Sequence, residues 1–343
     1  MKTVFVGLSG GVDSSVTAAL VKEQGYNVVG VYMKNWSQDL PGFACPWKED
    51  YQDAKRVAVQ LGIPFEMFDF ETEYRAKVVD YMIDEYKAGR TPNPDIMCNQ
   101  EVKFKLFLNT ALDKGADFVA TGHYARAIDG KLFTGLDSNK DQSYFLYRVT
   151  EEALTKTLFP LGGYTKPEVR KLAAKHNLVT ATKKESMGIC FVGKVGIKEF
   201  LQQYVTTEPG AIIDQFGRII GEHEGAIFYT IGQRHGLDVG GGLPYYVIGK
   251  DMAKNEVYVT TQLDDERLWL DKLTLTGLHW INQPPEPNKT YQVRVRYRAP
   301  LVAATFSDDL QHLQLKDAVR AVTPGQSAVV YDGEYVVGGG IVI

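Results

Sequence analysis

The sequence predicts an α/β fold with a doubly wound parallel sheet, followed by a small mixed α/β domain and a C-terminal β-barrel. Strand-like apolar runs alternate with amphipathic helical stretches in the first half of the chain. A glycine-rich loop directly follows the first of these runs, and only strand patterns occur after Leu268. We therefore expect three domains, at residues 1–200, 201–267 and 268–343.

Each element of the first domain follows from a local pattern. Short apolar runs, bounded by polar or turn residues, predict buried strands at residues 2–8, 27–33, 65–70 and 118–121. Apolar side chains at helical spacing predict helices at residues 13–24, 48–61, 72–87, 99–112, 166–176 and 197–205. Right-handed crossovers then restrict the topology to a doubly wound sheet with helices on both faces.

Short strands separated by turn residues dominate the rest of the chain. The predicted strands are residues 211–214, 218–221, 245–249, 256–260, 291–297, 328–331 and 335–337. The turn at Asp332–Gly333 is typical of a short β-hairpin. From residue 268 onward this pattern predicts a small barrel.

The composition is that of a globular protein. Of the 343 residues, 44% are hydrophobic and 23% are charged, which excludes a disordered chain. No run approaches the ~18 apolar residues of a membrane span, and residues 1–11 lack the pattern of a signal peptide. Three cysteines without a CxxC pair fit neither a disulfide framework nor a zinc finger. We therefore expect a cytoplasmic protein with no membrane partner.

The formal net charge of −4, taken alone, disfavours a nucleic-acid-binding protein, because such proteins are more often basic. The charge is unevenly distributed, however. Residues 1–200 contain 26 Lys+Arg and 25 Asp+Glu (net +1), residues 201–267 contain 5 and 10 (net −5), and residues 268–343 contain 7 and 7 (net 0). RNA binding by the first and last domains is thus compatible with the charge, with a shallow salt dependence.

The glycine-rich loop at residues 9–14, Ser-Gly-Gly-Val-Asp-Ser, leads into the first predicted helix. Its glycines let the backbone approach an anion, and the free N–H groups of the helix start point to the same place. Asp13 fits such a phosphate site if a Mg²⁺ ion lies between its carboxylate and the phosphate. The loop has neither the ending of a Walker A motif nor the spacing of a dinucleotide-binding motif. The alternative is a structural turn with a helix cap.

This loop resembles the PP-loop of the ATP pyrophosphatases, which cleave ATP between its α- and β-phosphates and adenylate a substrate oxygen. The resemblance implies that ATP is bound by the loop and by residues at the ends of two other strands. These residues are Gly7, Leu8, Ser9, Gly10, Gly11, Val12, Asp13, Ser14, Met33 and Gly122.

Cys98 ends a proline-rich segment, Thr-Pro-Asn-Pro-Asp-Ile-Met-Cys, at residues 91–98. It precedes the predicted helix at 99–112, and a helix N-terminus stabilises a thiolate. Asp95 is a candidate general acid or base, and Lys103 adds positive potential. We therefore interpret Cys98 as a reactive cysteine.

Cys190 is a second loop cysteine, bracketed by glycines and preceded by Lys183 and Lys184. This electropositive setting again favours a thiolate. Cys45 lies outside both loops and fits a buried small hydrophobic residue.

Seven sequence blocks, in the same order along the chain, resemble the tRNA-specific 2-thiouridylases, the MnmA family. They are SGGVDS (9–14), TPNPDxxCN (91–99), TGHYAR (121–126), KDQSYFL (140–146), ESxGICF (185–191), TxGQRHGL (230–237) and TPGQSAVxY…GGG (323–340). The resemblance implies that the wobble uridine of tRNA is converted to 2-thiouridine after ATP adenylates its O2 atom.

The same resemblance implies roles for individual residues. Cys190 would carry the sulfur as a persulfide supplied by a donor protein, and Cys98 would help to release it, leaving a Cys98–Cys190 disulfide. Asn93, Pro94 and Asp95 would contact the target base, which leaves its stack for the reaction. The residues that match tRNA contacts are His123, Lys140, Asp141, Gln142, Arg296, Tyr297 and Gln326.

Three arginines give an independent indication of RNA binding. In a strand over residues 291–297, Arg294, Arg296 and Arg298 share one face and form a positive ridge. The alternative is a solvated edge of the barrel, where charged side chains are common.

Other functions remain open at this point. A different ATP pyrophosphatase that adenylates a small molecule shares the loop but does not require two loop cysteines. An RNA-binding module with a vestigial ATP loop is a non-enzymatic alternative. Three cysteines also match the number that holds an iron–sulfur cluster in some related enzymes, although Cys45 lies outside the active motifs.

Overall fold

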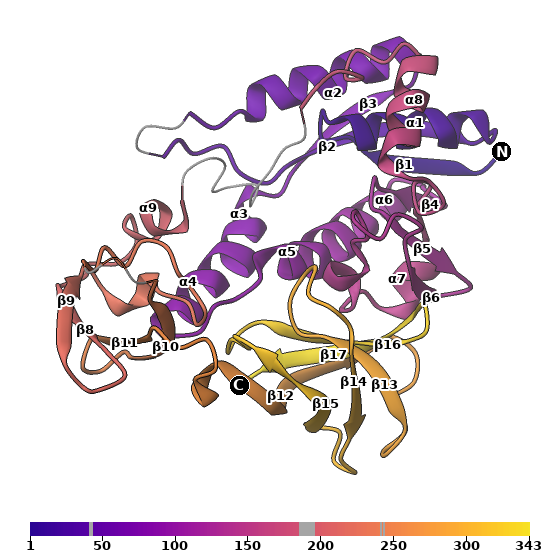
Figure 1. Ribbon diagram of the computed structural model, residues 1–343. Helices are drawn as coiled ribbons and strands as arrows, with labels where there is room; N and C mark the ends of the chain where they lie inside the picture. Colours follow the sequence, from indigo (N-terminus) through magenta and orange to yellow (C-terminus); the bar gives the residue numbers. More distant parts are fainter. Residues whose placement is uncertain (41–43, 185–195, 241, 243) are drawn as a thin grey trace.

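The structure, a computed structural model, describes residues 1–40, 44–184, 196–240, 242 and 244–343. In the view of Figure 1, the parallel sheet and its helices lie above the barrel, and the central domain lies to the left. No helix within the described ranges is long and apolar enough to cross a membrane.

A five-stranded parallel sheet forms the core of the first domain, with the strand order β3-β2-β1-β4-β7. The strands are β1 Thr3–Gly7, β2 Asn27–Lys34, β3 Phe65–Asp69, β4 Phe118–Ala120 and β7 Thr157–Leu158. The chain proceeds outward from the central β1 in both directions, so the predicted doubly wound topology is confirmed.

Helices cover both faces of this sheet. The strand β1 contributes to the core on each face, because successive side chains of a strand point to opposite sides. Val6 packs in one core with Ala18 and Val57, whereas Phe5 belongs to a second core that contains Phe107. The helices are α1 Val12–Glu23, α2 Trp47–Leu61, α3 Glu71–Tyr74, α4 Asp80–Lys87, α5 Pro94–Met97, α6 Leu108–Asp113, α7 Glu151–Thr155, α8 Lys166–Lys175 and α9 Ile197–Leu201. Two π-helical segments, Arg75–Val79 and Cys98–Phe107, join α3 to α4 and α5 to α6.

The helix that was expected to start at residue 99 begins five residues earlier, at Pro94. Proline suits the first position of a helix, where its missing N–H has no intrahelical partner. The Asn93 side chain caps the helix by accepting a hydrogen bond from the Asp95 N–H, at 3.2 Å. The prediction that Cys98 lies at a helix N-terminus is therefore wrong.

The central domain contains a four-stranded sheet with the order β10-β11-β8-β9. Its strands are β8 Gly210–Ile213, β9 Ile219–His223, β10 Tyr246–Asp251 and β11 Glu256–Thr260. A 3₁₀ turn at Ala226–Phe228 follows β9. The two predicted strand pairs are confirmed, since β8 pairs with β9 and β10 with β11 in antiparallel fashion.

The C-terminal strands close into a barrel in the order β12-β15-β14-β13-β16-β17, because β12 also pairs with β17. The strands are β12 Trp269–Trp280, β13 Thr290–Arg294, β14 Val302–Phe306, β15 His312–Arg320, β16 Ser327–Asp332 and β17 Tyr335–Val342. Leu275, Val293 and Phe306 are among the side chains that fill the interior. The predicted barrel is thus confirmed.

Two strands of the first half extend the barrel sheet and were not predicted. β5 Ala125–Ile128 and β6 Lys131–Thr134 form a hairpin, and β6 pairs with β17. The first domain and the barrel are therefore joined by backbone hydrogen bonds as well as by side-chain packing (Figure 1).

Candidate active site

The glycine-rich loop lies between β1 and α1, at the carboxyl end of the central strand. Gly10 has a φ of +74°, and a Cβ there would collide with the carbonyl oxygen of Asp50. Gly11 is the N-cap of α1, and no side chain in the described part of the protein caps this helix. The first N–H groups of α1 are thus available to an anionic ligand, as an ATP site requires.

The two serines of the loop hold its backbone in place. The Ser14 hydroxyl accepts a hydrogen bond from the Ser9 N–H at 3.1 Å and donates one to the Gly11 carbonyl at 3.1 Å. The two hydroxyl oxygens are 3.2 Å apart. These side chains therefore fix the shape of the loop from within.

Asp13 has two partners that the sequence did not reveal. The ammonium group of Lys166 lies 2.7 Å from both carboxylate oxygens, and the Tyr124 hydroxyl donates a hydrogen bond at 2.9 Å. Lys166 is only 8% exposed. A fixed cation thus lies beside the phosphate loop and compensates for the acidic residue in an anion-binding site.

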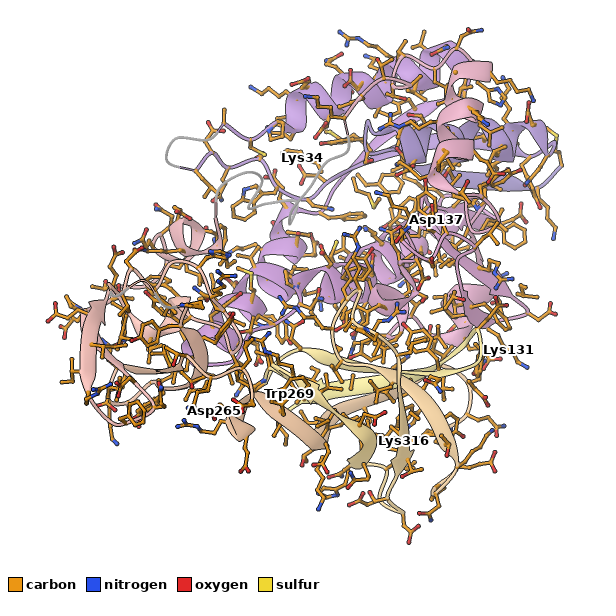
Figure 2. All side chains as sticks on the ribbon, in the orientation of Figure 1. Lys34, Lys131, Asp137, Asp265, Trp269 and Lys316 are labelled. Atoms are coloured by element: carbon orange, nitrogen blue, oxygen red, sulfur yellow. The ribbon has the colours of Figure 1, made fainter. Side chains whose placement is uncertain are left out.

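Lys166 is the first residue of α8, and its own N–H donates to the Asp137 carboxylate at 2.9 Å (Asp137 is labelled in Figure 2). Thr165 and Glu168 form a capping box at this helix start. A cation at the positive end of a helix dipole is unfavourable, unless an anion lies nearby. The sequence Thr-Lys-Pro-Glu therefore contained a signal for a partner of Lys166.

Three further predicted ATP-binding residues surround the start of α1. A Cβ on Gly122 would lie 3.0 Å from the Asp13 and Ser14 backbone, and one on Gly7 would lie 3.0 Å from Met33 Cε. The structure thus brings Gly7, Met33 and Gly122 to the phosphate loop, where larger side chains have no room.

A second cluster lies around Asp95, the second residue of α5. Burial raises the pKa of Asp95 above its ordinary value, and the positive charge of Lys103 partly offsets this shift. The Lys103 ammonium also lies 3.4 Å from His123 Nε2. A carboxyl group with a raised pKa beside a lysine is suited to general acid–base catalysis.

His123 is buried and neutral in this cluster, because burial and the Lys103 charge lower its pKa well below the ordinary value. Lys103 can only donate a hydrogen bond, so Nε2 accepts and the ring proton lies on Nδ1. Nδ1 then donates to the Thr121 hydroxyl at 2.7 Å. Phe104 and Phe159 enclose the ring. The structure thus gives His123 protein partners at both nitrogens.

Cys98 follows the first turn of the helix, and its N–H donates to the Pro94 carbonyl. The side chain is 5% exposed. A thiolate at this position does not receive the open N–H groups that a helix start would offer it. The predicted base-contacting residues, Asn93 to Asp95, form the cap and first turn of the same helix.

Cys190 lies outside the described residues, so the structure places only its expected neighbours. The Lys183 ammonium forms ion pairs with Asp50 at 2.9 Å and Asp53 at 2.6 Å, which neutralise much of the positive potential expected there. Cys45 donates a hydrogen bond to the Trp36 carbonyl at 3.7 Å, and burial raises the pKa of its thiol.

Asp141 and Gln142, two more of the predicted tRNA-contacting residues, also have structural partners in the first domain. Asp141 is 4% exposed and accepts hydrogen bonds from Gly135 and Ser143. The Gln142 side chain accepts from the Tyr124 N–H at 3.0 Å. Their neighbour Lys140 is only partly buried.

The three arginines at the end of β13 do not form the predicted ridge. The strand ends at Arg294, whose guanidinium turns inward to Asp141 at 3.5 Å. Arg296 begins a turn, and Arg298 has a φ of +63°. The buried carboxylate of Asp141 draws in the first arginine, so only Arg296 and Arg298 are exposed.

Tyr297 and Gln326 face the first domain from the barrel. The Tyr297 ring packs against Phe145, with centroids 4.4 Å apart. The Gln326 amide donates to the Thr91 carbonyl at 2.8 Å and to the Pro92 carbonyl at 3.4 Å. Gln326 thus contacts the segment that leads to Asn93 and Asp95.

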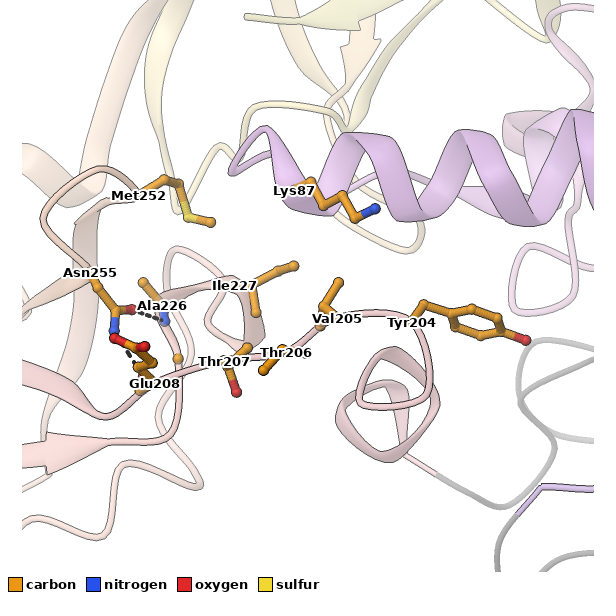
Figure 3. Close-up of a pocket in the computed structure, with 11 residues that line it drawn as sticks. Lys87, Tyr204, Val205, Thr206, Thr207, Glu208, Ala226, Ile227, Met252 and Asn255 are labelled. Atoms are coloured by element: carbon orange, nitrogen blue, oxygen red, sulfur yellow. Dashed lines mark hydrogen bonds between the residues drawn. The ribbon is translucent and has the colours of Figure 1, made fainter.

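A separate cavity of about 460 Å³ lies between the end of α4 and the central domain (Figure 3). Lys87, Tyr204 and Met252 are among its lining residues. It contains none of the predicted site residues.

The fold and the site together define an ATP-binding enzyme with a PP-loop, in which a C-terminal barrel contacts the segment at Thr91 and Pro92. Family models match residues 2–194 (tRNA methyl transferase HUP domain), 198–261 (tRNA methyl transferase PRC-barrel domain) and 270–342 (Aminomethyltransferase beta-barrel domain). The chain belongs to the tRNA-specific 2-thiouridylase family, MnmA.

Full-length relatives support this assignment. The chain is 49% identical to the tRNA-specific 2-thiouridylase MnmA of Bacillus licheniformis and 48% identical to that of Bacillus subtilis, with 99% of this chain and 94% of each relative covered. A solved 4-thiouridine synthetase–RNA complex with bound ATP has a TM-score of only 0.40, with 19% identity over 59% of this chain and 50% of that chain. This weak likeness adds nothing to the assignment.

Proposed function

We propose that the protein carries out the ATP-dependent 2-thiolation of the wobble uridine of tRNA, with ATP at the loop before α1 and the base beside Asn93–Asp95. One observation carries the proposal: consecutive residues after β4 contact both regions. Gly122 packs against Asp13, Tyr124 donates to Asp13, and His123 between them contacts Lys103. The contacts of residues 122–124 with both regions support a base at the Asp95 cluster and a phosphate at the loop as neighbours, an arrangement that would lower the entropic part of the barrier.

In the first proposed step, uridine O2 attacks the α-phosphorus of ATP, and pyrophosphate leaves with the electron pair of the broken P–O bond. The N–H groups of the α1 start and the Lys166 ammonium stabilise the charge that develops on the phosphates. Asp95, whose pKa is raised by burial, exchanges a proton with the base.

In the second proposed step, the terminal sulfur of a Cys190 persulfide attacks C2 of the activated uridine. Cys98 then attacks Sγ of Cys190, the sulfur–sulfur bond of the persulfide breaks, and AMP leaves. The products are 2-thiouridine and a Cys98–Cys190 disulfide, which a thiol reductant returns to two thiols.

The proposal includes Mg²⁺ as a companion of ATP. Asp13 is already bonded to Lys166 and Tyr124, and the described residues contain no group of three or more metal-ligating side chains. Phosphate oxygens and water would therefore supply most of the ligands, as is common for Mg²⁺.

The remaining parts of the proposal concern partners and organisation. A persulfide donor supplies the sulfur in the cytoplasm, and tRNA contacts Lys140, Arg296 and Tyr297. The catalytic, central and barrel domains correspond to residues 1–200, 201–267 and 268–343.

Nucleoside analysis of tRNA incubated with the protein, ATP and a persulfide donor tests the function. We expect 2-thiouridine from the wild type and from Cys45→Ser, which retains both proposed reactive cysteines. Cys98→Ser should form none above background. If both Cys98→Ser and Cys190→Ser still form 2-thiouridine, the sulfur does not pass through these thiols, and the proposed role of the two cysteines is wrong.

A further inference from the structure

A turn of the barrel, far away in the sequence, binds the segment that carries Asn93 and Asp95. The Gln326 amide donates to the Thr91 and Pro92 carbonyls at 2.8 and 3.4 Å. In return, the Thr91 N–H donates to the Pro324 carbonyl at 2.8 Å. This clasp, residues 323–326 against Thr91 and Pro92, joins positions more than 230 residues apart in the sequence.

Glycine at position 325 allows the two backbones to approach. Its φ is +92°, and a Cβ there would lie 2.8–2.9 Å from the N, C and O atoms of Thr91. Any side chain at this position would therefore push against main-chain atoms that cannot move aside without displacing the segment.

The barrel side of the clasp is itself fixed to the first domain. Ser327 follows Gln326 directly, its carbonyl accepts from the Tyr144 hydroxyl at 2.9 Å, and its hydroxyl lies 3.0 Å from that of Tyr147. Both tyrosines are fully buried. The adjacent Phe145 carbonyl accepts from the Asn99 amide at 3.0 Å. Asn99 lies in the π-helical segment that continues the Asp95 helix, so this helix is bonded to the same part of the first domain.

The segment depends on such outside partners because it lacks secondary structure of its own before Pro94. Pro92 and Pro94 have no N–H, so the segment offers carbonyls with few local donors. The Gln326 amide supplies donors to two successive carbonyls, immediately before the Asn93 cap that starts the Asp95 helix.

We propose that Gln326 is a positioning residue for the thiolation reaction: the clasp from the barrel sets the position of Asn93 and Asp95 relative to the phosphate loop. The barrel thereby contributes to turnover in addition to any contact with tRNA. This inference deepens the proposed function and rests on it for the identity of the substrate.

Hydrogen–deuterium exchange of the tRNA-free protein tests the clasp without any assumption about activity. We expect Gln326→Ala and Gly325→Ala to raise exchange at residues 91–99, with little change in the barrel strands. Gln292→Ala, an exposed barrel glutamine, and Gly333→Ala, which has a φ of +61° and nothing within 4 Å of its Cβ, are the matched controls. Unchanged exchange at 91–99 in both clasp variants overturns the inference.

Kinetics separate positioning from tRNA binding. A positioning role predicts that Gln326→Ala lowers kcat about tenfold or more with little change in KM for tRNA, since small misplacements of reacting groups are costly. Gln326→Glu keeps the size but removes the donors, so it should behave like Gln326→Ala. A raised KM with unchanged kcat means that Gln326 is a tRNA contact and contradicts the proposal. Absence of thiolation by the wild type would contradict the proposed function, whereas the exchange result would still decide the clasp.

Discussion

The phosphate loop and the Thr91–Cys98 segment belong to the same domain but are stabilised in different ways. The loop is a contiguous strand–turn–helix unit in which Ser9, Gly11 and Ser14 bond to one another. The segment owes its position to other domains: Gln326 of the barrel binds its carbonyls, and the Thr230 hydroxyl of the central domain lies 3.2 Å from that of Thr91.

This difference separates two kinds of functional site. A local unit keeps its geometry wherever the strand and helix form, so substitutions elsewhere should leave ATP binding intact. The position of a segment that three domains hold depends on all of them, so a change in the barrel can displace it. Lys166 and Tyr124 are exceptions, because they bind Asp13 of this unit from 153 and 111 residues away.

Replacing this charged long-range partner should have the largest effect on the phosphate loop. We expect Lys166→Met to lower kcat/KM for ATP by about 10²–10³-fold, because a preorganised charge at the phosphates is lost and Asp13 loses its cation. The measurement is tRNA-dependent thiolation as a function of ATP concentration. Lys171→Met, on the exposed side of the same helix, is the matched control. Equal activity of the two variants would show that the loop does not depend on the Lys166 charge.

The contrast also explains what the sequence predicted. The fold class and the phosphate loop follow from strand and helix periodicity and from two glycines, which are local signals. Gly122 and Met33, which the family resemblance assigned to the ATP site, lie beside Asp13 and Gly7, since the ends of neighbouring parallel strands meet at one edge.

The missing parts depend on tertiary packing. No spacing in the sequence indicates that Gln326 binds Thr91, or that His123 is buried between Phe104 and Phe159. The arginine pattern at residues 294–298 suggested a regular strand, but a buried carboxylate drew Arg294 inward and the strand ended there. Periodicity predicts on which face of a helix or strand a residue lies. It does not indicate a distant partner at which the strand ends.

A glycine comparison tests whether the loop is as local as proposed. Gly10→Ala should destabilise the protein by about 1–3 kcal/mol from its positive φ, and the collision with the Asp50 carbonyl should add to this and weaken ATP binding. Gly25→Ala, with a φ of +85° and nothing within 4 Å of its Cβ, should show only the backbone cost. Thermal unfolding with and without ATP measures both effects, since a ligand that binds the folded state raises Tm. An equal ATP-dependent rise in Tm for both variants would mean that Gly10 does not shape the ATP site.

The smallest expected effect concerns Lys103, which links the two regions through His123 and Asp95. Lys103 lowers the pKa of Asp95, while burial raises it, so Lys103→Met should raise this pKa further. The midpoint of the Asp95-dependent limb of the kcat/KM profile should therefore move to higher pH. Lys105→Met is the control, because Lys105 pairs with Glu101 instead.

The pH dependence of the free energy of unfolding should shift in the same direction as the kinetic limb, toward higher pH. A carboxyl group whose pKa is higher in the folded than in the unfolded protein stabilises the fold fully below the unfolded value, and this contribution is lost as pH rises through the folded pKa. Lys103→Met should extend that loss to higher pH, and the additional substitution Asp95→Asn should abolish both the kinetic limb and this part of the stability profile. If the pH limb of the kcat/KM profile persists without Asp95, another group titrates in the cluster. If the midpoint of this limb does not move in Lys103→Met, the two regions are electrostatically independent. The link through residues 121–124 is then one of packing alone.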